Sequence, residues 1–359
     1  MFKLYRLVSL LLIVSCTQKA ELDEILYKQA AGIVCVGIGF DGVQTELSHK
    51  DVSLLQDLQP GGVILMNKWN LPFLKNWPKN LPLFMESMHN AAKRPMLYAV
   101  DQEGGRVSRM SYKKGYPYVM FPKDIGSLNN RDTTEYYATI LAELTSNNGF
   151  NFNFAPCVDL NVYPESPVIG KLKRSFSEDP DIVSNIAEIY YDEHRQRGVM
   201  TALKHFPGHG SARVDSHNKF TDISDTWTED ELLPYKQLIA KGKCGAIVVG
   251  HLYNSNLDSD YPATLSYRTI TGLLKDSLGF EGLVVSDDMV MDAIQEYWPK
   301  EEYLELAINA GVDMLVFSRG GKGFYKDIVE TIVKLVEEGK IPRSRLEEAY
   351  DKVLNNIYE

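Results

Sequence analysis

The chain contains little cysteine and carries no excess of positive charge. Only four cysteines occur in 359 residues, with no Cys-x-x-Cys pair, and Cys35, Cys157 and Cys244 lie far apart, each in or beside an apolar run. This spacing predicts buried thiols rather than a disulfide framework. The formal net charge of −10 argues against a nucleic acid partner, because phosphate binding needs a basic surface. A neutral ligand such as a sugar remains open.

Long apolar stretches are also missing, and the stretch with targeting features stands at the N-terminus. Lys3 and Arg6 precede Leu7–Val14, which is apolar except for Ser9 and too short to span a bilayer as a stable helix. A basic start followed by such a run is typical of a secretory signal peptide. We therefore expect a signal peptide over residues 1–15.

This expected signal peptide is followed directly by a cysteine. Residues 13–16 read IVSC, which resembles a bacterial lipobox and implies that Cys16 is lipidated and becomes the mature N-terminus. A plain signal peptide cleaved nearby, with Cys16 incidental, is the alternative. On the lipobox interpretation residues 16–27 form a tether. The protein would then be a membrane-anchored bacterial lipoprotein on the periplasmic or cell-surface side.

The remaining chain alternates short apolar runs with amphipathic segments such as Thr134–Asn147. The runs are continuous, as in parallel strands buried on both faces. Eight alternations over residues 28–359 predict an α/β fold, a single (β/α)8 barrel of the TIM type. An open doubly wound sheet is the rival, but no Gly-rich phosphate loop follows the first run. The expected strands are Ile33–Ile38, Val63–Met66, Met96–Val100, Phe150–Phe154, Met200–Leu203, Ala246–Val249, Leu283–Val285 and Met314–Phe317.

Polar residues directly follow several of these runs. In a parallel barrel the carboxyl ends of the strands meet at one face, which carries the active site. A single Asp there has an ordinary explanation, because it commonly caps the next helix. Several charged groups at one face would desolvate one another, a cost that a ligand or a function must offset. The residues concerned are Asp101, Lys204, His205, His251, Asp287 and Asp288.

A loop after the fifth run carries two further candidates. Pro207 and Gly208 prevent a continuing helix, so this loop should project over the barrel mouth. Asp215 and His217 are close enough for the carboxylate to bond one imidazole nitrogen and leave the other to exchange a proton. An Asx-type turn with a solvated histidine is the alternative.

The same region contains side chains that zinc prefers. His205, His209, Asp215 and His217 are all potential ligands. However, Phe206–Gly208 separates the first two histidines, so they do not share a helical face as in His-Glu-x-x-His. We therefore expect neither a metal nor another cofactor.

Several motifs together point to one family. Lys204–Gly210 reads KHFPGHG, and Asp215 and His217 follow it. These segments resemble the signature of family-3 glycoside hydrolases of the NagZ type, which are β-N-acetylglucosaminidases, and the resemblance covers roughly residues 28–320. The other matching segments, in the family's order, are Asp101–Val107 (DQEGGRV), Asn153–Pro156 (NFAP), Arg174–Phe176 (RSF), Ser286–Met289 (SDDM) and Ala310–Asp313 (AGVD).

The resemblance implies roles for individual residues. Asp287, the first Asp of SDDM, is implied to be the nucleophile, and Asp288 is implied to be structural. His217 is implied to be the general acid/base, with Asp215 as its partner. The residues implied to bind the sugar at the −1 subsite, through its hydroxyls and acetamido oxygen, are Asp101, Arg109, Arg174, Lys204 and His205.

Two segments depart from the family pattern and leave the substrate preference open. Met66–Asn70 lacks the Arg-Asn ending expected there, and Met289–Met291 replaces a more usual Leu-Ser-Met. The expected activity is exo-hydrolysis of terminal β-linked N-acetylglucosamine from peptidoglycan fragments or chitooligosaccharides through a covalent glycosyl-enzyme. A family-3 β-glucosidase or β-xylosidase, and a lipid-tethered sugar-binding protein without catalysis, are the alternatives.

Overall fold

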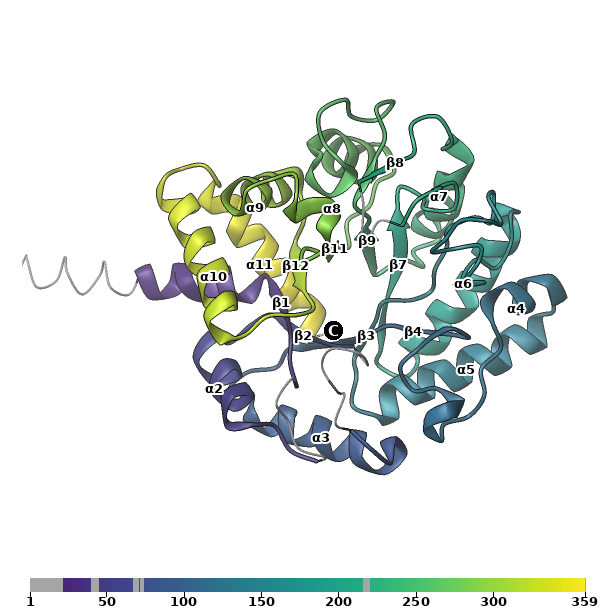
Figure 1. Ribbon diagram of the computed structural model, residues 1–359, viewed down its shortest axis with the longest axis horizontal. Coiled ribbons are helices and arrows are strands. Elements are labelled where there is room, and N and C mark those ends of the chain that lie inside the picture. Colours follow the sequence, from purple (N-terminus) through teal and green to yellow (C-terminus); the bar gives the residue numbers. More distant parts are fainter. Residues whose placement is uncertain (1–21, 40–44, 67–70, 72–73, 216–219, 359) are drawn as a thin grey trace, which may run out of the picture.

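The structure, a computed structural model, has a closed barrel of parallel strands at its centre with helices around it (Figure 1). It describes residues 22–39, 45–66, 71, 74–215 and 220–358. The predicted (β/α)8 barrel is therefore confirmed. In the order in which they pair, the barrel strands are β1 (Val34–Gly37), β12 (Met314–Phe317), β11 (Leu283–Asp288), β9 (Ala246–Val249), β7 (Met200–Phe206), β6 (Phe152–Asn153), β3 (Leu97–Val100) and β2 (Gly62–Leu65), which pairs with β1 again.

Helices connect the barrel strands and cover the outside of the barrel (Figure 1). They are α2 (His49–Leu58), α3 (Trp77–Ala91), α4 (Pro122–Leu128), α5 (Arg131–Asn147), α6 (Pro180–Arg195), α7 (Leu233–Ala240), α8 (Asp292–Gln295), α9 (Lys300–Ala310), α10 (Lys322–Glu337) and α11 (Arg343–Tyr358). The remaining elements are β4 (Gln102–Gly104) with β5 (Val107–Ser108), β8 (Thr221–Asp222) with β10 (Leu252–Tyr253), the short 3-10 helices η1 (Tyr112–Lys114), η2 (Glu229–Leu232) and η3 (Ala263–Leu265), and the π-helix η4 (Arg268–Ser277).

Helix α6 shows how local sequence builds the outer layer. Asp179 caps its N-terminus by accepting from the backbone N–H of Asp181 at 2.8 Å, and Pro180 occupies the first helical position. Apolar residues then recur every three or four positions and form the buried face of the helix. Members of this face include Val183, Ile186, Ala187 and Tyr190.

Side chains of the barrel strands divide between two apolar layers. Ala99 and Val285 belong to the cluster inside the barrel, whereas their neighbours Val100 and Val284 belong to the larger cluster that includes the helices. Because side chains alternate along a strand, the residue two positions beyond an inward-facing one also points into the barrel. This alternation decides which residues point inward at the carboxyl ends of the strands.

The folded part of the chain begins before the expected domain boundary. Residues 22–32 form a helix, and Leu26 packs into the core, so part of the segment expected to be a tether is helical. Cys16 lies outside the described residues, and its lipidation stays a prediction. Among the residues that the structure describes, no helix is long and apolar enough to cross a bilayer.

Within the described residues, Cys35, Cys157 and Cys244 are free thiols. Cys35 and Cys157 are buried, as expected, and Cys244 is partly buried. Burial raises the pKa of Cys35 far above its usual value, so this thiol keeps its proton.

Candidate active site

A cavity of about 630 Å³ lies at the carboxyl ends of the barrel strands. Its lining includes residues that come two positions after inward-facing strand residues and therefore point the same way. Asp101 comes two positions after Ala99, and Asp287 two positions after Val285. The cavity is therefore bounded below by the top layer of the barrel interior, as in other parallel barrels. Further strand residues and their direct extensions that line it are Met66, Phe154, Lys204, Val248 and Ser318.

Irregular pairing in two strands brings adjacent residues into the cavity. Leu203–Phe206 of β7 pairs opposite Ile247–Val249 of β9, so three steps along one strand match two along the other. The same mismatch sets Val285–Asp288 of β11 opposite Met314–Val316 of β12. An extra residue of this kind re-aims the side chains near it. The consecutive pairs that line the cavity as a result are Lys204 with His205 and Asp287 with Asp288.

One wall of the cavity carries a carboxylate held by two cations. Asp101 accepts a hydrogen bond from Lys204 Nζ at 2.7 Å and another from Arg109 Nη2 at 2.7 Å. Burial by itself would raise the pKa of Asp101, but Lys204 and Arg109 outweigh it and hold this pKa well below its usual range. Asp101 is therefore ionised and can accept further bonds from ligand hydroxyls.

A second carboxylate, Glu103, fixes the cations of this wall. It receives Arg174 Nε at 2.9 Å and Nη2 at 2.7 Å, and its Oε1 lies 2.6 Å from Lys204 Nζ. The side chains of Glu103 and Arg174 are only 1% and 8% exposed. Burial would raise the pKa of Glu103, yet Arg174 and then Lys204 lower it to about 2. We call Asp101, Glu103, Arg109, Arg174 and Lys204 the paired wall.

His205 is oriented by the buried carboxylate of Asp159. Asp159 Oδ2 lies 2.7 Å from Nδ1 of His205, and Oδ1 accepts the backbone N–H of His205 at 3.0 Å. The other ring nitrogen, Nε2, lies 3.3 Å from Arg174 Nη2. Because a guanidinium can only donate, Nε2 is the acceptor and Nδ1 carries the proton toward Asp159.

His209 forms an uncharged part of the cavity lining. It is 2% exposed, and its ring meets that of His205 edge to face with centroids 5.5 Å apart. Burial, with His205 as the next cause, lowers the pKa of His209 to about 4. The ring is therefore neutral at neutral pH.

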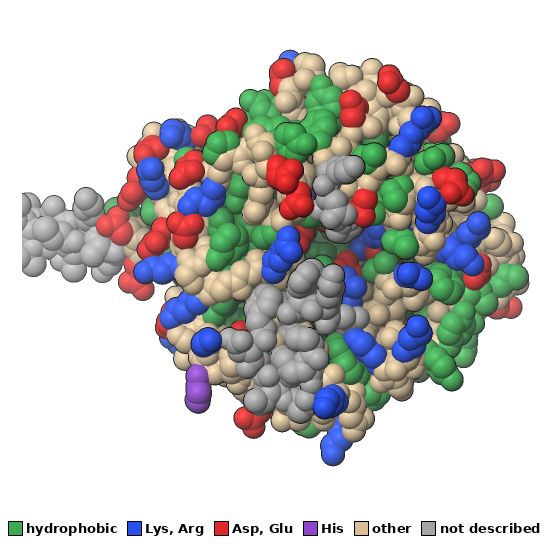
Figure 2. All heavy atoms as spheres, in the orientation of Figure 1, with side chains coloured by type: hydrophobic (Ala, Val, Ile, Leu, Met, Phe, Trp, Pro, Cys, Tyr) green, Lys and Arg blue, Asp and Glu red, His purple; other side chains and the backbone are tan. Residues whose placement is uncertain are grey.

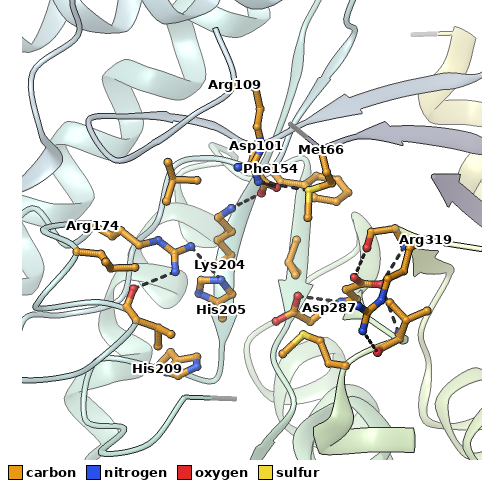
Figure 3. Close-up of a pocket in the computed structure, with 18 of the residues that line it drawn as sticks. Met66, Asp101, Arg109, Phe154, Arg174, Lys204, His205, His209, Asp287 and Arg319 are labelled. Atoms are coloured by element: carbon orange, nitrogen blue, oxygen red, sulfur yellow. Dashed lines mark hydrogen bonds and ion pairs between the residues drawn. The ribbon is translucent and has the colours of Figure 1, made fainter. Parts of the chain in front are cut away.

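The opposite wall carries two adjacent carboxylates. Asp287 faces Lys204 and His205 across the cavity (Figure 3). Asp288 instead accepts from the backbone N–H groups of Ser318 at 2.9 Å and Val290 at 3.3 Å, and from the Ser318 hydroxyl. Burial, with the charge of Asp287 adding to it, raises the pKa of Asp288 despite these donors. We call Asp287 and Asp288 the carboxylate wall.

The outer surface around the cavity also has positive and negative side chains on different sides. Figure 2 shows a hollow at the centre of this face, with Lys and Arg side chains along its right side and acidic side chains above it. Arg319, which follows β12, also lines the cavity and donates from Nη2 to the carbonyl of Val290 at 3.2 Å.

The structure brings most of the predicted site residues together. Asp215 is half-buried in the loop after β7 and is not among the cavity residues. His217 lies outside the described residues, so its pairing with Asp215 stays a prediction. The predicted residues that line the one cavity are Asp101, Arg109, Arg174, Lys204, His205 and Asp287.

Within the described residues, one set of side chains has the spacing of metal ligands. Ligand atoms of Cys157, Asp159 and His205 lie within 4.8 Å of one another. The Cys157 thiol donates to Asp159 Oδ2 at 3.2 Å, and burial, followed by Asp159, raises its pKa well above the usual value. Since metals bind the thiolate, a thiol that keeps its proton is a poor ligand. We interpret the three residues as a hydrogen-bonded chain that orients His205.

Sequence reasoning missed four residues of this site. Asp159 stands alone between Val158 and Leu160, and an acidic residue inside an apolar stretch signals a buried partner. Glu103 belongs to the DQEGGRV motif, but the resemblance implies no role for it. The other missed residues are His209, considered only as a metal ligand, and Arg319, whose signal is its place just after the eighth strand.

Comparison with known proteins gives related enzymes across most of the chain. A protein named Beta-hexosaminidase from Tolumonas auensis is 35% identical over 279 residues, which cover 76% of this chain and 79% of that protein. A glycoside hydrolase family 3 beta-N-acetylglucosaminidase structure from Paenibacillus sp. str. FPU-7 matches with a TM-score of 0.82 at 27% identity. The match covers 92% of this chain and 61% of that longer one.

A structure of similar length agrees. M tuberculosis LpqI matches with a TM-score of 0.77 and 26% identity over 92% of this chain and 93% of its own. The sequence profile described as Glycosyl hydrolase family 3 N terminal domain matches residues 22–356, which span the whole barrel. The predicted family is confirmed: the chain belongs to glycosyl hydrolase family 3 and is an enzyme of the glycoside hydrolase type.

Proposed function

We propose that the protein is a retaining exo-β-N-acetylhexosaminidase that removes terminal β-linked N-acetylglucosamine from peptidoglycan fragments or chitooligosaccharides. The observation that carries this proposal is the position of Asp287 across one cavity from Lys204 and His205 (Figure 3). The cavity volume falls in the range of small-molecule sites. Relatives named for hexosaminidase and acetylglucosaminidase activity support the choice of sugar.

In the proposed mechanism Asp287 is the nucleophile and His217 the acid/base. A carboxylate oxygen of Asp287 bonds to the anomeric carbon while the glycosidic C–O bond breaks, and the leaving oxygen takes a proton from His217. His217 then takes a proton from water, whose oxygen bonds to the anomeric carbon as the Asp287 ester breaks. Two inversions give net retention, and Asp215 would hold the imidazole in the required tautomer.

The paired wall would bind the non-reducing sugar. Lys204 and Arg174 can donate to hydroxyls or to the acetamido oxygen, and Asp101 can accept from ring hydroxyls. Because Asp101 and Glu103 already hold these cations in place, the wall needs little rearrangement when the sugar enters.

The stereochemistry of the first product tests the mechanism. With an aryl β-N-acetylglucosaminide, NMR of the newly released sugar should show the β anomer before mutarotation. Mass spectrometry of protein quenched during turnover of a slow substrate should find a glycosyl adduct on the peptide that contains Asp287. Early release of the α anomer would exclude the covalent route.

The role of His217 is tested by varying the leaving group. His217→Ala should lower kcat/KM strongly for substrates with poor leaving groups and far less for activated aryl glycosides, because only poor leaving groups need the proton. The same substrates given to His49→Ala, a change at a histidine outside the cavity, supply the control. Equal losses on both substrate classes would argue against the acid role.

A product assay separates the two proposed substrate classes and the alternative sugars. The enzyme would be given muropeptides, chitooligosaccharides, and aryl glucosides and xylosides in parallel. We expect N-acetylglucosamine to be released from at least one of the first two, and little turnover of the glucosides or xylosides. Preferred hydrolysis of a glucoside or xyloside would assign a different family-3 activity.

We also propose that the enzyme is held at a membrane, outside the cytoplasm, through a lipid on Cys16. The support is the signal pattern of residues 1–16. In cells fed a labelled fatty acid, wild-type protein should carry the label and sediment with membranes, whereas Cys16→Ser should do neither. An unlabelled, soluble wild-type protein would contradict the anchor.

A further inference from the structure

The chain between β7 and Asp215 is held in place by two buried carboxylates. Residues 201–212 are all buried, and His209 lies in the middle of the turn that follows the strand. The backbone N–H of His209 donates to Asp159 Oδ1 at 2.8 Å. The next two N–H groups, of Gly210 and Ser211, donate to Oε2 of Glu231 at 2.9 and 3.3 Å. His209 is thus fixed on both sides along the backbone.

Glu231 comes from a separate element, η2, that packs against this turn. A side chain at Gly208 would place its Cβ 2.6 Å from the Cβ of Glu231, which leaves room for glycine alone. The φ of Gly208 is +122°, a conformation that other residues rarely adopt. A few positions before Glu231, Trp227 Nε1 donates to the carbonyl of Pro207 at 3.0 Å. Trp227 and Glu231 therefore contact the two ends of the turn around His209.

The burial of Glu231 is unfavourable in free energy. Its exposed fraction is 1%, and in the described part of the chain no lysine or arginine forms an ion pair with it. Its other oxygen, Oε1, has no hydrogen-bond partner within the same described residues. Burial, with the charge of Asp159 contributing, raises the pKa of Glu231 to about 7. A buried carboxylate with only part of its bonding satisfied is destabilising, so Glu231 does not serve the stability of the fold alone.

We infer that Glu231 is a positioning residue: it acts through His209 and holds that ring in the cavity lining where the sugar binds. Its carboxylate accepts the two N–H groups that follow His209, while Asp159 accepts the N–H of His209 itself and orients His205. The expected effect of Glu231 on catalysis rests on the proposed glycosidase function. Its expected effect on the turn rests on the backbone hydrogen bonds alone.

Two variants of Glu231 test the inference in the full-length protein. Glu231→Ala removes the acceptor, and we expect kcat/KM for an aryl β-N-acetylglucosaminide to fall about 100-fold per folded molecule, the size of loss that a misplacement of about 1 Å can cause. Glu231→Gln keeps an acceptor oxygen at the same place, and it should restore kcat/KM to within about 10-fold of wild type. Glu229→Gln, an exposed carboxylate of the same η2 turn, is the control and should match wild type.

A double variant identifies the route of the effect. If Glu231 acts through His209, Glu231→Ala added to His209→Ala should lower kcat/KM no further than His209→Ala does alone. A purely structural role predicts that the two losses multiply, or that activity per folded molecule stays unchanged while Tm falls. Either of these results, or a His209→Ala variant with wild-type kinetics, overturns the inference.

Amide exchange separates this inference from the proposed function. In Glu231→Ala the amides of residues 208–212 should exchange faster than in wild type and in Glu229→Gln, with the amides of the barrel strands unchanged. If the wild type hydrolysed no hexosaminide, the proposed function would fail and exchange would still decide whether Glu231 holds the turn. Unchanged exchange in Glu231→Ala would overturn the inference whatever the enzyme hydrolyses.

Discussion

The two walls of the cavity balance their charges differently. In the paired wall, Asp101 and Glu103 contact cations at 2.6 to 2.9 Å, and both carboxyl groups have a lowered pKa. In the carboxylate wall, Asp288 is bonded to neutral N–H and O–H donors and its pKa is raised. An anion tied to cations must break those contacts before it attacks carbon. The paired wall is thus suited to binding, and the carboxylate wall can supply a nucleophile.

The largest expected effect comes from removing the nucleophile. Asp287→Asn should lower kcat by roughly 10⁴-fold or more, the scale of loss found when a nucleophile is deleted, with Tm close to wild type. Steady-state hydrolysis of an aryl β-N-acetylglucosaminide measures it. Asp292→Asn, on the same side of the cavity, is the matched control and should stay within about 10-fold. A variant at Asp287 with near-wild-type turnover would assign the chemistry to another group.

The protein should be destabilised when one of the anions in the paired wall is neutralised. Glu103→Gln leaves the Arg174 guanidinium buried without its bidentate partner, and we expect a loss of about 3 to 5 kcal/mol in the free energy of unfolding. Urea unfolding measures it. Glu103→Gln combined with Arg174→Gln should recover part of the loss, because the stranded charge is gone. A single variant within about 1 kcal/mol of wild type would contradict the role of this pair.

Glu103 in the paired wall and Asp288 in the carboxylate wall should change the free energy of unfolding in opposite directions as the pH rises. The pKa of Glu103 is lowered from 4.5 to about 2, so the unfolded chain binds more protons between these values. Its contribution to stability is complete above pH 4.5 and is lost as the pH falls toward 2. The pKa of Asp288 is raised from 3.8, so its contribution is complete below pH 3.8 and is lost as the pH rises through the raised value.

Unfolding free energy measured against pH checks these signs. Glu103→Gln should reduce the acid-side slope below pH 4.5, whereas Asp288→Asn should make stability rise more steeply with pH just above pH 3.8, because it removes an opposing contribution. Glu229→Gln, at an exposed carboxylate, serves as the reference. Identical slopes in the two wall variants would mean that the walls do not differ in this way.

The fold was more accessible from sequence than the site. The eight apolar runs predicted the eight strands because a strand buried on both faces leaves a continuous apolar signature. The irregular pairing that turns both His205 and Asp288 into the cavity leaves no such signature, since it depends on register against the neighbouring strand. Asp159 and Glu231 lie far along the chain from the groups they hold, so local pattern could not assign their partners.

The smallest expected effect comes from one donor of the carboxylate wall. Ser318→Ala removes a hydroxyl that donates to Asp288. The backbone N–H groups of Ser318 and Val290 still donate to this carboxylate. We expect the free energy of unfolding to fall by about 1 kcal/mol and kcat by less than about 3-fold, because the hydroxyl donates to Asp288, whereas the proposed nucleophile is Asp287. Urea unfolding and aryl glycoside kinetics measure the two. Ser127→Ala, at an exposed hydroxyl on α4, is the control. A loss of kcat comparable to that of Asp287→Asn would show that Asp288 takes part in the chemistry and is not only structural.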